Sequence, residues 1–156
     1  MRTRLAATLA AGMFAGAIIQ AAAFGGETPS ISGPTTIHVI EHARTDTVTD
    51  TGATGDSTGD LLTFHNPVFD SNNSAKVGQD RGDCIRISPA QGTWECRWVT
   101  HLQGGSITVE GPFNDHSDTT MPITGGSGTY RDARGQMALK SRAGGTQYDF
   151  IFSVDR

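Results

Sequence analysis

The chain has 156 residues, with 12 Lys and Arg against 16 Asp and Glu, and only two cysteines. This length favours one domain, and the formal net charge of −4 argues against nucleic acid as a partner, since a nucleic-acid-binding domain carries a clustered basic face. Two cysteines are too few for a disulfide-rich scaffold or a four-cysteine zinc site, and the 20 glycines, with many Thr and Ser, favour strands and turns.

Residues 1–23 are predicted to be a signal peptide. Arg2 and Arg4 give a short basic start, an uncharged run rich in Ala, Gly and Leu follows, and the small residues before Phe24 suit a signal peptidase. We therefore expect a secreted protein, with residues 24–34 as a flexible lead-in, residues 35–156 as the folded domain, and no membrane partner after cleavage. The alternative is a retained anchor, because residues 5–24 have roughly the length that crosses a bilayer.

The mature chain is predicted to be all-β. Thr35–Ala43 alternates as a strand does, Thr45–Asp60 has no periodicity and is predicted to be a solvated linker, and no helical period follows residue 35. Eight antiparallel strands can close into a barrel, which removes the exposed sheet edges, with a flat sandwich as the competing architecture. The seven further predicted strands, separated by Gly, Pro, Asn or Asp, are Leu61–Phe69, Val77–Ser88, Thr93–Leu102, Ser106–Phe113, Thr119–Thr124, Thr129–Leu139 and Thr146–Val154.

Strand alternation predicts which side chains face the interior. The aromatic face of each strand is expected to point inward, because buried rings stabilise the fold most. A hairpin centred at residue 90 sets Cys84 opposite Cys96, and export would place both in an oxidising compartment where they can pair. The residues predicted to line an interior pocket are Cys84, Trp94, Cys96, Trp98, Phe113, Tyr148, Phe150 and Phe152.

The same register turns two ionisable side chains, Glu41 and Arg86, toward the interior. Charged groups in an apolar interior are costly unless they pair or face water. Three interpretations follow: a structural ion pair that closes one end of the barrel, a functional carboxylate with a perturbed pKa, or a register that is wrong by one residue.

Three segments, GDLLTFHN (59–66), ITVEGPF (107–113) and ITGGSGTYRDARGQM (123–137), occur in the order and at the spacing found in one superfamily. Over most of residues 37–154 the chain resembles the allene oxide cyclase and dirigent superfamily. The resemblance implies an eight-stranded antiparallel barrel, a homo-oligomer (trimer or dimer), and an apolar pocket that opens at one end. It also implies pocket roles for Glu41, Asn66 and Cys84.

We expect a cyclase or isomerase that folds a hydrophobic, unsaturated small molecule inside the barrel. In this hypothesis Glu41 stabilises positive charge or directs proton movement, Arg86 orients Glu41 or a substrate oxygen, and Asn66 holds a water or a carbonyl. The alternatives are a non-catalytic dirigent-like or lipophilic-ligand-binding barrel, and a structural barrel with a filled interior.

No cofactor or metal is predicted. His38 and His42 lie four residues apart on one strand, so about 13 Å separates them at roughly 3.3 Å per residue, too far for one chelate pair.

Overall fold

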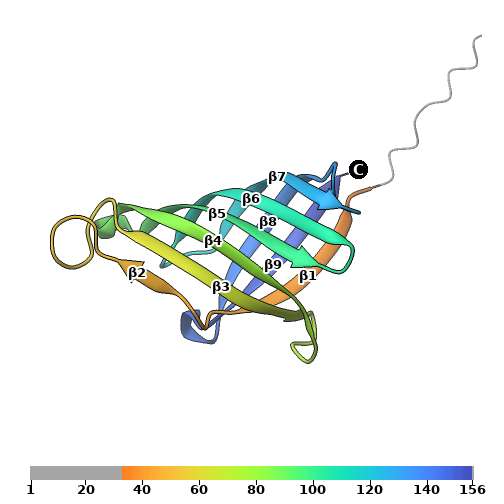
Figure 1. Cartoon of the computed structure of the whole chain (residues 1–156), viewed down its shortest axis with the longest axis horizontal. Coiled ribbons are helices and arrows are strands. Elements are labelled where there is room, and N and C mark those ends of the chain that lie inside the picture. Colours follow the sequence, from red (N-terminus) through yellow and green to blue (C-terminus); the bar gives the residue numbers. More distant parts are fainter. Residues whose placement is uncertain (1–32, 156) are drawn as a thin grey trace, which may run out of the picture. The chain divides into compact units, whose positions relative to one another are not determined.

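This computed structural model describes residues 33–155, and the predicted signal peptide and most of the lead-in lie outside the described residues. Within 33–155, antiparallel strands form one sheet that curls round on itself (Figure 1). The strands are β1 (Thr35–His42), β2 (Thr47–Thr49), β3 (Leu61–Asp70), β4 (Lys76–Ser88), β5 (Thr93–Leu102), β6 (Gly105–Asn114), β7 (Thr119–Gly128), β8 (Arg134–Arg142) and β9 (Gln147–Asp155). No helix of this described part is long and apolar enough to cross a membrane.

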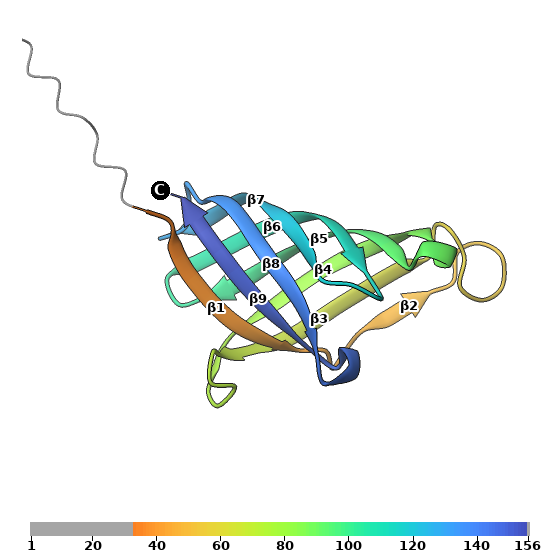
Figure 2. The same cartoon turned by 180° about the vertical axis from the view of Figure 1, so that it is seen from behind.

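The sheet closes into an eight-stranded barrel. Its order is β1-β9-β8-β7-β6-β5-β4-β3-β2, and β1 also pairs with β3, where Glu41 lies opposite Val68. Figure 2 shows β1 lying beside β9 on the wall of the barrel. The three-residue β2 pairs with the start of β3, beyond the segment of β3 that β1 covers. The predicted fold class, an eight-stranded antiparallel barrel, is confirmed.

The predicted hairpin register between β4 and β5 is confirmed. Cys84 lies opposite Cys96, and the two form a disulfide. A short 3-10 turn, η1 (Pro89–Gln91), joins the two strands and ends at Gly92, whose φ of 64° is a left-handed conformation that suits glycine. The side chains of β5 alternate as predicted, with Trp94, Cys96 and Trp98 buried between neighbours that are exposed or half-buried.

Two predicted segments differ from the structure. The strand predicted at Thr129–Leu139 was wrong at its start: β7 continues to Gly128, and residues 129–133 form a turn held by backbone hydrogen bonds such as Ala133 N to Tyr130 O. The segment Thr45–Asp60 was predicted to be a solvated linker. It contains β2, and its last part is fixed to β4 by two backbone hydrogen bonds, from Gly59 N to Arg86 O and from Arg86 N to Asp60 O.

The two ends of the barrel interior differ. Toward the end where β1 starts and β9 finishes, apolar side chains fill the interior, including the fully buried Phe152, Met137 and Ile107. At the other end, where β1 finishes and β9 begins, polar groups enter the interior beside a cavity. Glu41 and Tyr148 face each other there across β1 and β9.

Candidate functional site

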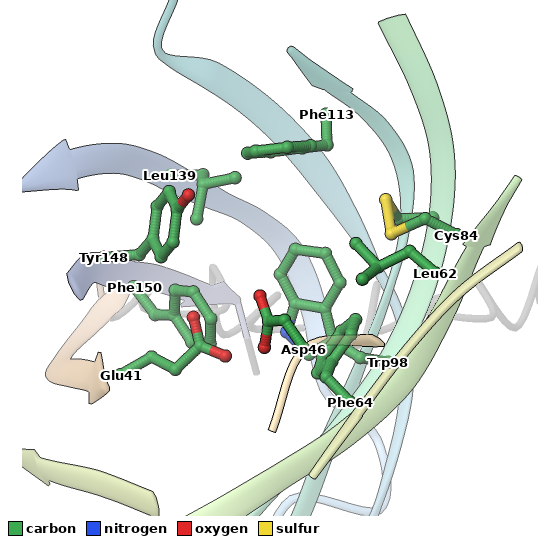
Figure 3. A pocket seen from close by; sticks show the side chains of 11 residues that line it. Glu41, Asp46, Leu62, Phe64, Cys84, Trp98, Phe113, Leu139, Tyr148 and Phe150 are labelled. Atoms are coloured by element: carbon green, nitrogen blue, oxygen red, sulfur yellow. A yellow bond between two sulfur atoms is a disulfide. The ribbon is translucent and has the colours of Figure 1, made fainter. Parts of the chain in front are cut away.

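A cavity of about 60 Å³ lies at this second end of the barrel. One buried water needs about 10–15 Å³, so the cavity has room for a few water molecules. The carboxyl groups of Glu41 and Asp46 share this space with the rings around it (Figure 3). The apolar lining consists of Leu62, Phe64, Trp98, Phe113, Leu139, Tyr148 and Phe150, together with the Cys84–Cys96 disulfide.

Glu41 forms a carboxyl pair with Asp80, a residue that the sequence analysis missed. Glu41 is 5% exposed and Asp80 is fully buried, each carboxyl group affects the pKa of the other, and Asp80 Oδ2 has no hydrogen-bond partner among the described residues. The other oxygen of Asp80, Oδ1, accepts a bond of 3.2 Å from the backbone N–H of Asn66. Two ionised carboxylates can only accept hydrogen bonds, so a proton on one of the two groups is what would let them bond to each other and satisfy Asp80 Oδ2.

Burial and mutual repulsion explain why this pair keeps a proton. Burial, with the nearby Asp46 charge, raises the pKa of Glu41 to about 7, although the hydrogen bond from Asn66 opposes the rise. Burial, followed by the charge of Glu41, raises the pKa of Asp80 to about 10. The two groups therefore titrate as a unit, and near neutral pH the pair holds at least one proton.

Asn66 fixes the positions of two carboxyl groups. It is 1% exposed, and its Nδ2 donates bonds of 2.7 Å to both Glu41 Oε1 and Asp46 Oδ1. Its Oδ1 accepts bonds from the backbone N–H groups of Arg44 and Thr45 and from the Thr45 hydroxyl. Both N–H donors of the amide are therefore engaged by carboxyl groups. The amide joins the segment after β1 to the barrel and aims Asp46 at the cavity.

Arg86 does not meet Glu41, in contrast to the prediction. Its guanidinium donates two bonds of 2.7 and 2.8 Å to Asp56 and another to Asp115, and it stacks 3.9 Å from the centre of the Trp94 ring. Trp94 also donates from Nε1 to Asp115. The reason is that Arg86 and Trp94 lie near the rim of the barrel, where the loop carboxylates of Asp56 and Asp115 are close enough to bind them. Of the three interpretations of Glu41 and Arg86, the structural ion pair between them is therefore wrong: within residues 33–155, Arg86 pairs with Asp56 and Asp115.

The cavity is lined by six of the eight predicted pocket residues. Cys84, Cys96, Trp98, Phe113, Tyr148 and Phe150 lie in the lining. Trp94 packs against Arg86 instead, and Phe152 is buried in the filled end of the barrel, beyond Phe150 along β9.

Two acidic residues of the site were missed for different reasons. Asp80 has the same inward parity as Cys84 and Arg86 on β4, so the alternation that placed those residues also points to it. Asp46 lies between β1 and β2, where no periodicity signals orientation. Within residues 33–155, no group of three or more His, Cys, Asp or Glu side chains is arranged to hold a metal ion.

Comparison with solved structures places this barrel in one fold class. A pyocyanin demethylase is similar with a TM-score of 0.64 and 24% identity, covering 76% of this chain and all of the other. The pterocarpan synthase dirigent protein PsPTS1 is similar with a TM-score of 0.61 and 19% identity, covering 78% and 96%. The Diels-Alderase AbmU from Streptomyces koyangensis is similar with a TM-score of 0.62 and 14% identity, covering 85% and 71%.

These similarities define a class of barrel shared by allene oxide cyclase-like and dirigent proteins, and at such identities they establish the fold alone. Residues 38–152, nearly the whole described domain, match the family described as allene oxide cyclase. The chain belongs to the allene oxide cyclase family.

Proposed function

We propose that this protein is a cyclase or isomerase that binds a hydrophobic, unsaturated small molecule at the cavity end of the barrel and uses Glu41 to move a proton or stabilise positive charge during ring closure. The observation that carries the proposal is a pair of buried carboxyl groups, Glu41 and Asp80, beside a cavity walled by aromatic rings, where burial raises the pKa of both groups. The family and its structural relatives, which include a Diels-Alderase and a dirigent protein, support a cyclase-type or dirigent-like function.

The roles of the residues follow from their contacts. Glu41 lines the cavity and is the catalytic residue, because a carboxyl with a pKa of about 7 exchanges a proton readily near neutral pH. Asp80 and Asn66 touch Glu41 but do not line the cavity, so they are positioning residues. The rings fold the substrate into a reactive geometry, which lowers the entropic part of the barrier.

The cavity is smaller than the roughly 300–1,000 Å³ that holds a drug-sized ligand, so a ring-forming substrate has to displace side chains at its mouth. The half-buried apolar and aromatic side chains of the lining are Leu62, Phe64, Phe113 and Tyr148. Phe113 and Tyr148 meet edge to face, with ring centres 5.9 Å apart. Their separation opens the cavity toward solvent without breaking a strand pairing.

The test compares wild-type protein with Glu41→Gln on a panel of conjugated polyenes and allylic epoxides. Ring closure by isomerisation conserves mass, so a product is a new chromatographic peak with the mass of its substrate. We expect Glu41→Gln to lower turnover about 100-fold or more, as loss of an acid–base group does, with ligand binding retained.

Glu95→Gln is the matched control, because Glu95 is exposed on the outer face of β5 and its loss leaves turnover unchanged. Unaltered turnover in Glu41→Gln contradicts an acid–base role. Wild-type protein that binds a panel member and changes only the stereochemistry of a reaction driven by another catalyst would favour the dirigent-like alternative.

A further inference from the structure

The cavity lining has an unusual balance of charge. Of the described residues that form it, two are acidic, Glu41 and Asp46, and none is basic. The lining also contains five rings, those of Phe64, Trp98, Phe113, Tyr148 and Phe150. The faces of aromatic rings carry negative partial charge, so carboxyl groups and rings attract a cation together and repel an anion.

The nearby arginines do not offset this charge. The guanidinium of Arg86 is held by two carboxylates, Asp56 and Asp115. Arg44 lies over the ring of Phe69, with its guanidinium carbon 5.9 Å from the ring centre, and contacts His42. Phe69 alternates with the inward-facing Val68, so this cluster is on the outer side of the wall.

The phenol of Tyr148 reflects the same local field. Burial raises its pKa, and the charges of Glu41, Asp46 and Asp115 raise it further, because each of them disfavours another negative charge beside the cavity. A carboxylate ligand would meet the same repulsion.

The size of the cavity and a buried donor without a partner restrict the kind of ligand that fits. At about 10–15 Å³ for each water, a cavity of about 60 Å³ has room for a few waters. A group the size of a trimethylammonium head with a short substituent would fill the same space. Trp98 is 3% exposed, and its Nε1 has no hydrogen-bond partner among the described residues. A buried donor without a partner is costly, which favours a ligand that also brings an acceptor oxygen.

We propose that this cavity selects a compact organic cation, such as an N-methylated ammonium or heteroaromatic group, over neutral or anionic groups of the same shape. The inference rests on the proposed function, because it assumes that the substrate occupies this cavity, and it adds the charge of the group that enters. Ring faces and the Asp46 carboxylate contact the cation, and the carboxyl pair lies behind it.

The test uses three probes of nearly equal shape: choline, its neutral carbon isostere 3,3-dimethylbutan-1-ol, and the anion 3,3-dimethylbutanoate. Dissociation constants are measured by titration calorimetry and ligand-observed NMR on the purified full chain. We expect choline to bind at least 10-fold more tightly than the alcohol, and the anion to bind most weakly. Raising the salt concentration should weaken choline binding several-fold and leave the alcohol unchanged.

Asp46→Asn keeps the shape of the side chain and removes its charge, so it should reduce the preference for choline over the alcohol several-fold. Asp132→Asn, on the exposed turn between β7 and β8, is the matched control and should leave the preference unchanged. Equal binding of choline and the alcohol, tighter binding of the anion, or no binding of any probe overturns the inference.

The salt dependence in wild-type protein provides a second readout if Asp46→Asn disturbs the fold. Failure of the probe series is distinguishable from failure of the proposed function, because turnover in Glu41→Gln is measured with the separate substrate panel. A large loss of turnover in that variant, together with equal binding of the probes, rejects the charge preference and leaves the acid–base role in place.

Discussion

Asp80 explains why an acid such as Glu41 is stable inside an apolar barrel. A single buried carboxylate would lack compensation for its lost hydration, whereas two carboxyl groups that share a proton satisfy each other and carry less charge. Asn66 supplies the remaining donors, to Glu41 through its side chain and to Asp80 through its backbone. The sequence led to Glu41 and Asn66 through their positions in strands and motifs, but the pairing with Asp80 requires knowing that barrel closure places β1 and β4 on either side of β3.

The carboxyl pair predicts how stability depends on pH. Because the pKa values of Glu41 and Asp80 lie above their unfolded values of 4.5 and 3.8, the folded protein binds more protons than the unfolded chain from about pH 5 upward. The free energy of unfolding therefore falls as pH rises from 5 to 8, by at most about 1.4 kcal/mol per pH unit for each proton. Asp80→Asn should flatten this fall. Removing one proton held across three pH units means that the free energy of unfolding of the variant gains about 4 kcal/mol on that of wild type between pH 5 and pH 8.

Urea unfolding of both proteins at several pH values measures this difference. Burial lowers the pKa of His101, with the charges of Arg81 and His65 adding to the effect, and this gives an opposite slope that cancels because both proteins contain it. Asp132→Asn should follow wild type at every pH. Parallel curves for wild type and Asp80→Asn would show that the pair does not hold the extra proton.

At the scale of elements, the β4–β5 hairpin was predictable and the loop before β3 was not. The hairpin follows from strand alternation and turn residues close in sequence, which is why the pairing of Cys84 with Cys96 could be inferred from counting. The loop from Asp50 to Asp60 depends on contacts from distant elements, such as the bidentate bond from Arg86 to Asp56. Its own hydrogen bonds, from Ser57 and Thr51 to Asp60, lower the pKa of that carboxyl.

Reduction of the disulfide should destabilise the barrel. Closing a loop of 12 residues contributes about 2–3 kcal/mol on the chain-entropy model, so chemical unfolding with a thiol reductant should show a loss of that size. Intact mass without reductant should be lower by two hydrogens. A Cys84→Ala, Cys96→Ala double variant separates effects of the reductant from loss of the bond. Two free thiols in the purified protein would contradict the pairing.

Arg86→Lys should loosen the loop that carries Asp56. Lysine is a point charge that cannot donate the paired bonds of the guanidinium, and loss of charge-assisted bonds worth about 1.5–3 kcal/mol should speed amide exchange in residues 51–60 by tenfold or more. Hydrogen exchange read by mass spectrometry measures this. Arg97→Lys is the control, since Arg97 is exposed and lies 3.9 Å from Asp83. Unchanged exchange in Arg86→Lys would mean that the loop is held by its backbone bonds alone.

At the scale of the whole molecule, the closed barrel turns a local pattern into a site. Closure brings Glu41 from the first strand beside Asn66 and Asp80 from β3 and β4, and lets β9 supply Tyr148 and Phe150. Strand number, antiparallel order and inward aromatic faces were predictable because alternation is a property of each strand alone. The size of the cavity was not, since it depends on how side chains from seven strands and a loop pack together.

Infrared spectroscopy of the carboxyl groups tests the retained proton most directly. At pH 8, between the pKa values of Glu41 and Asp80, wild-type protein should keep a carbonyl stretch from one protonated carboxyl in a dry environment. Asp80→Asn should lose that band, and the control Asp132→Asn should keep it. A wild-type spectrum at pH 8 with ionised carboxylates alone would contradict the shared proton, and with it the acid–base role given to Glu41.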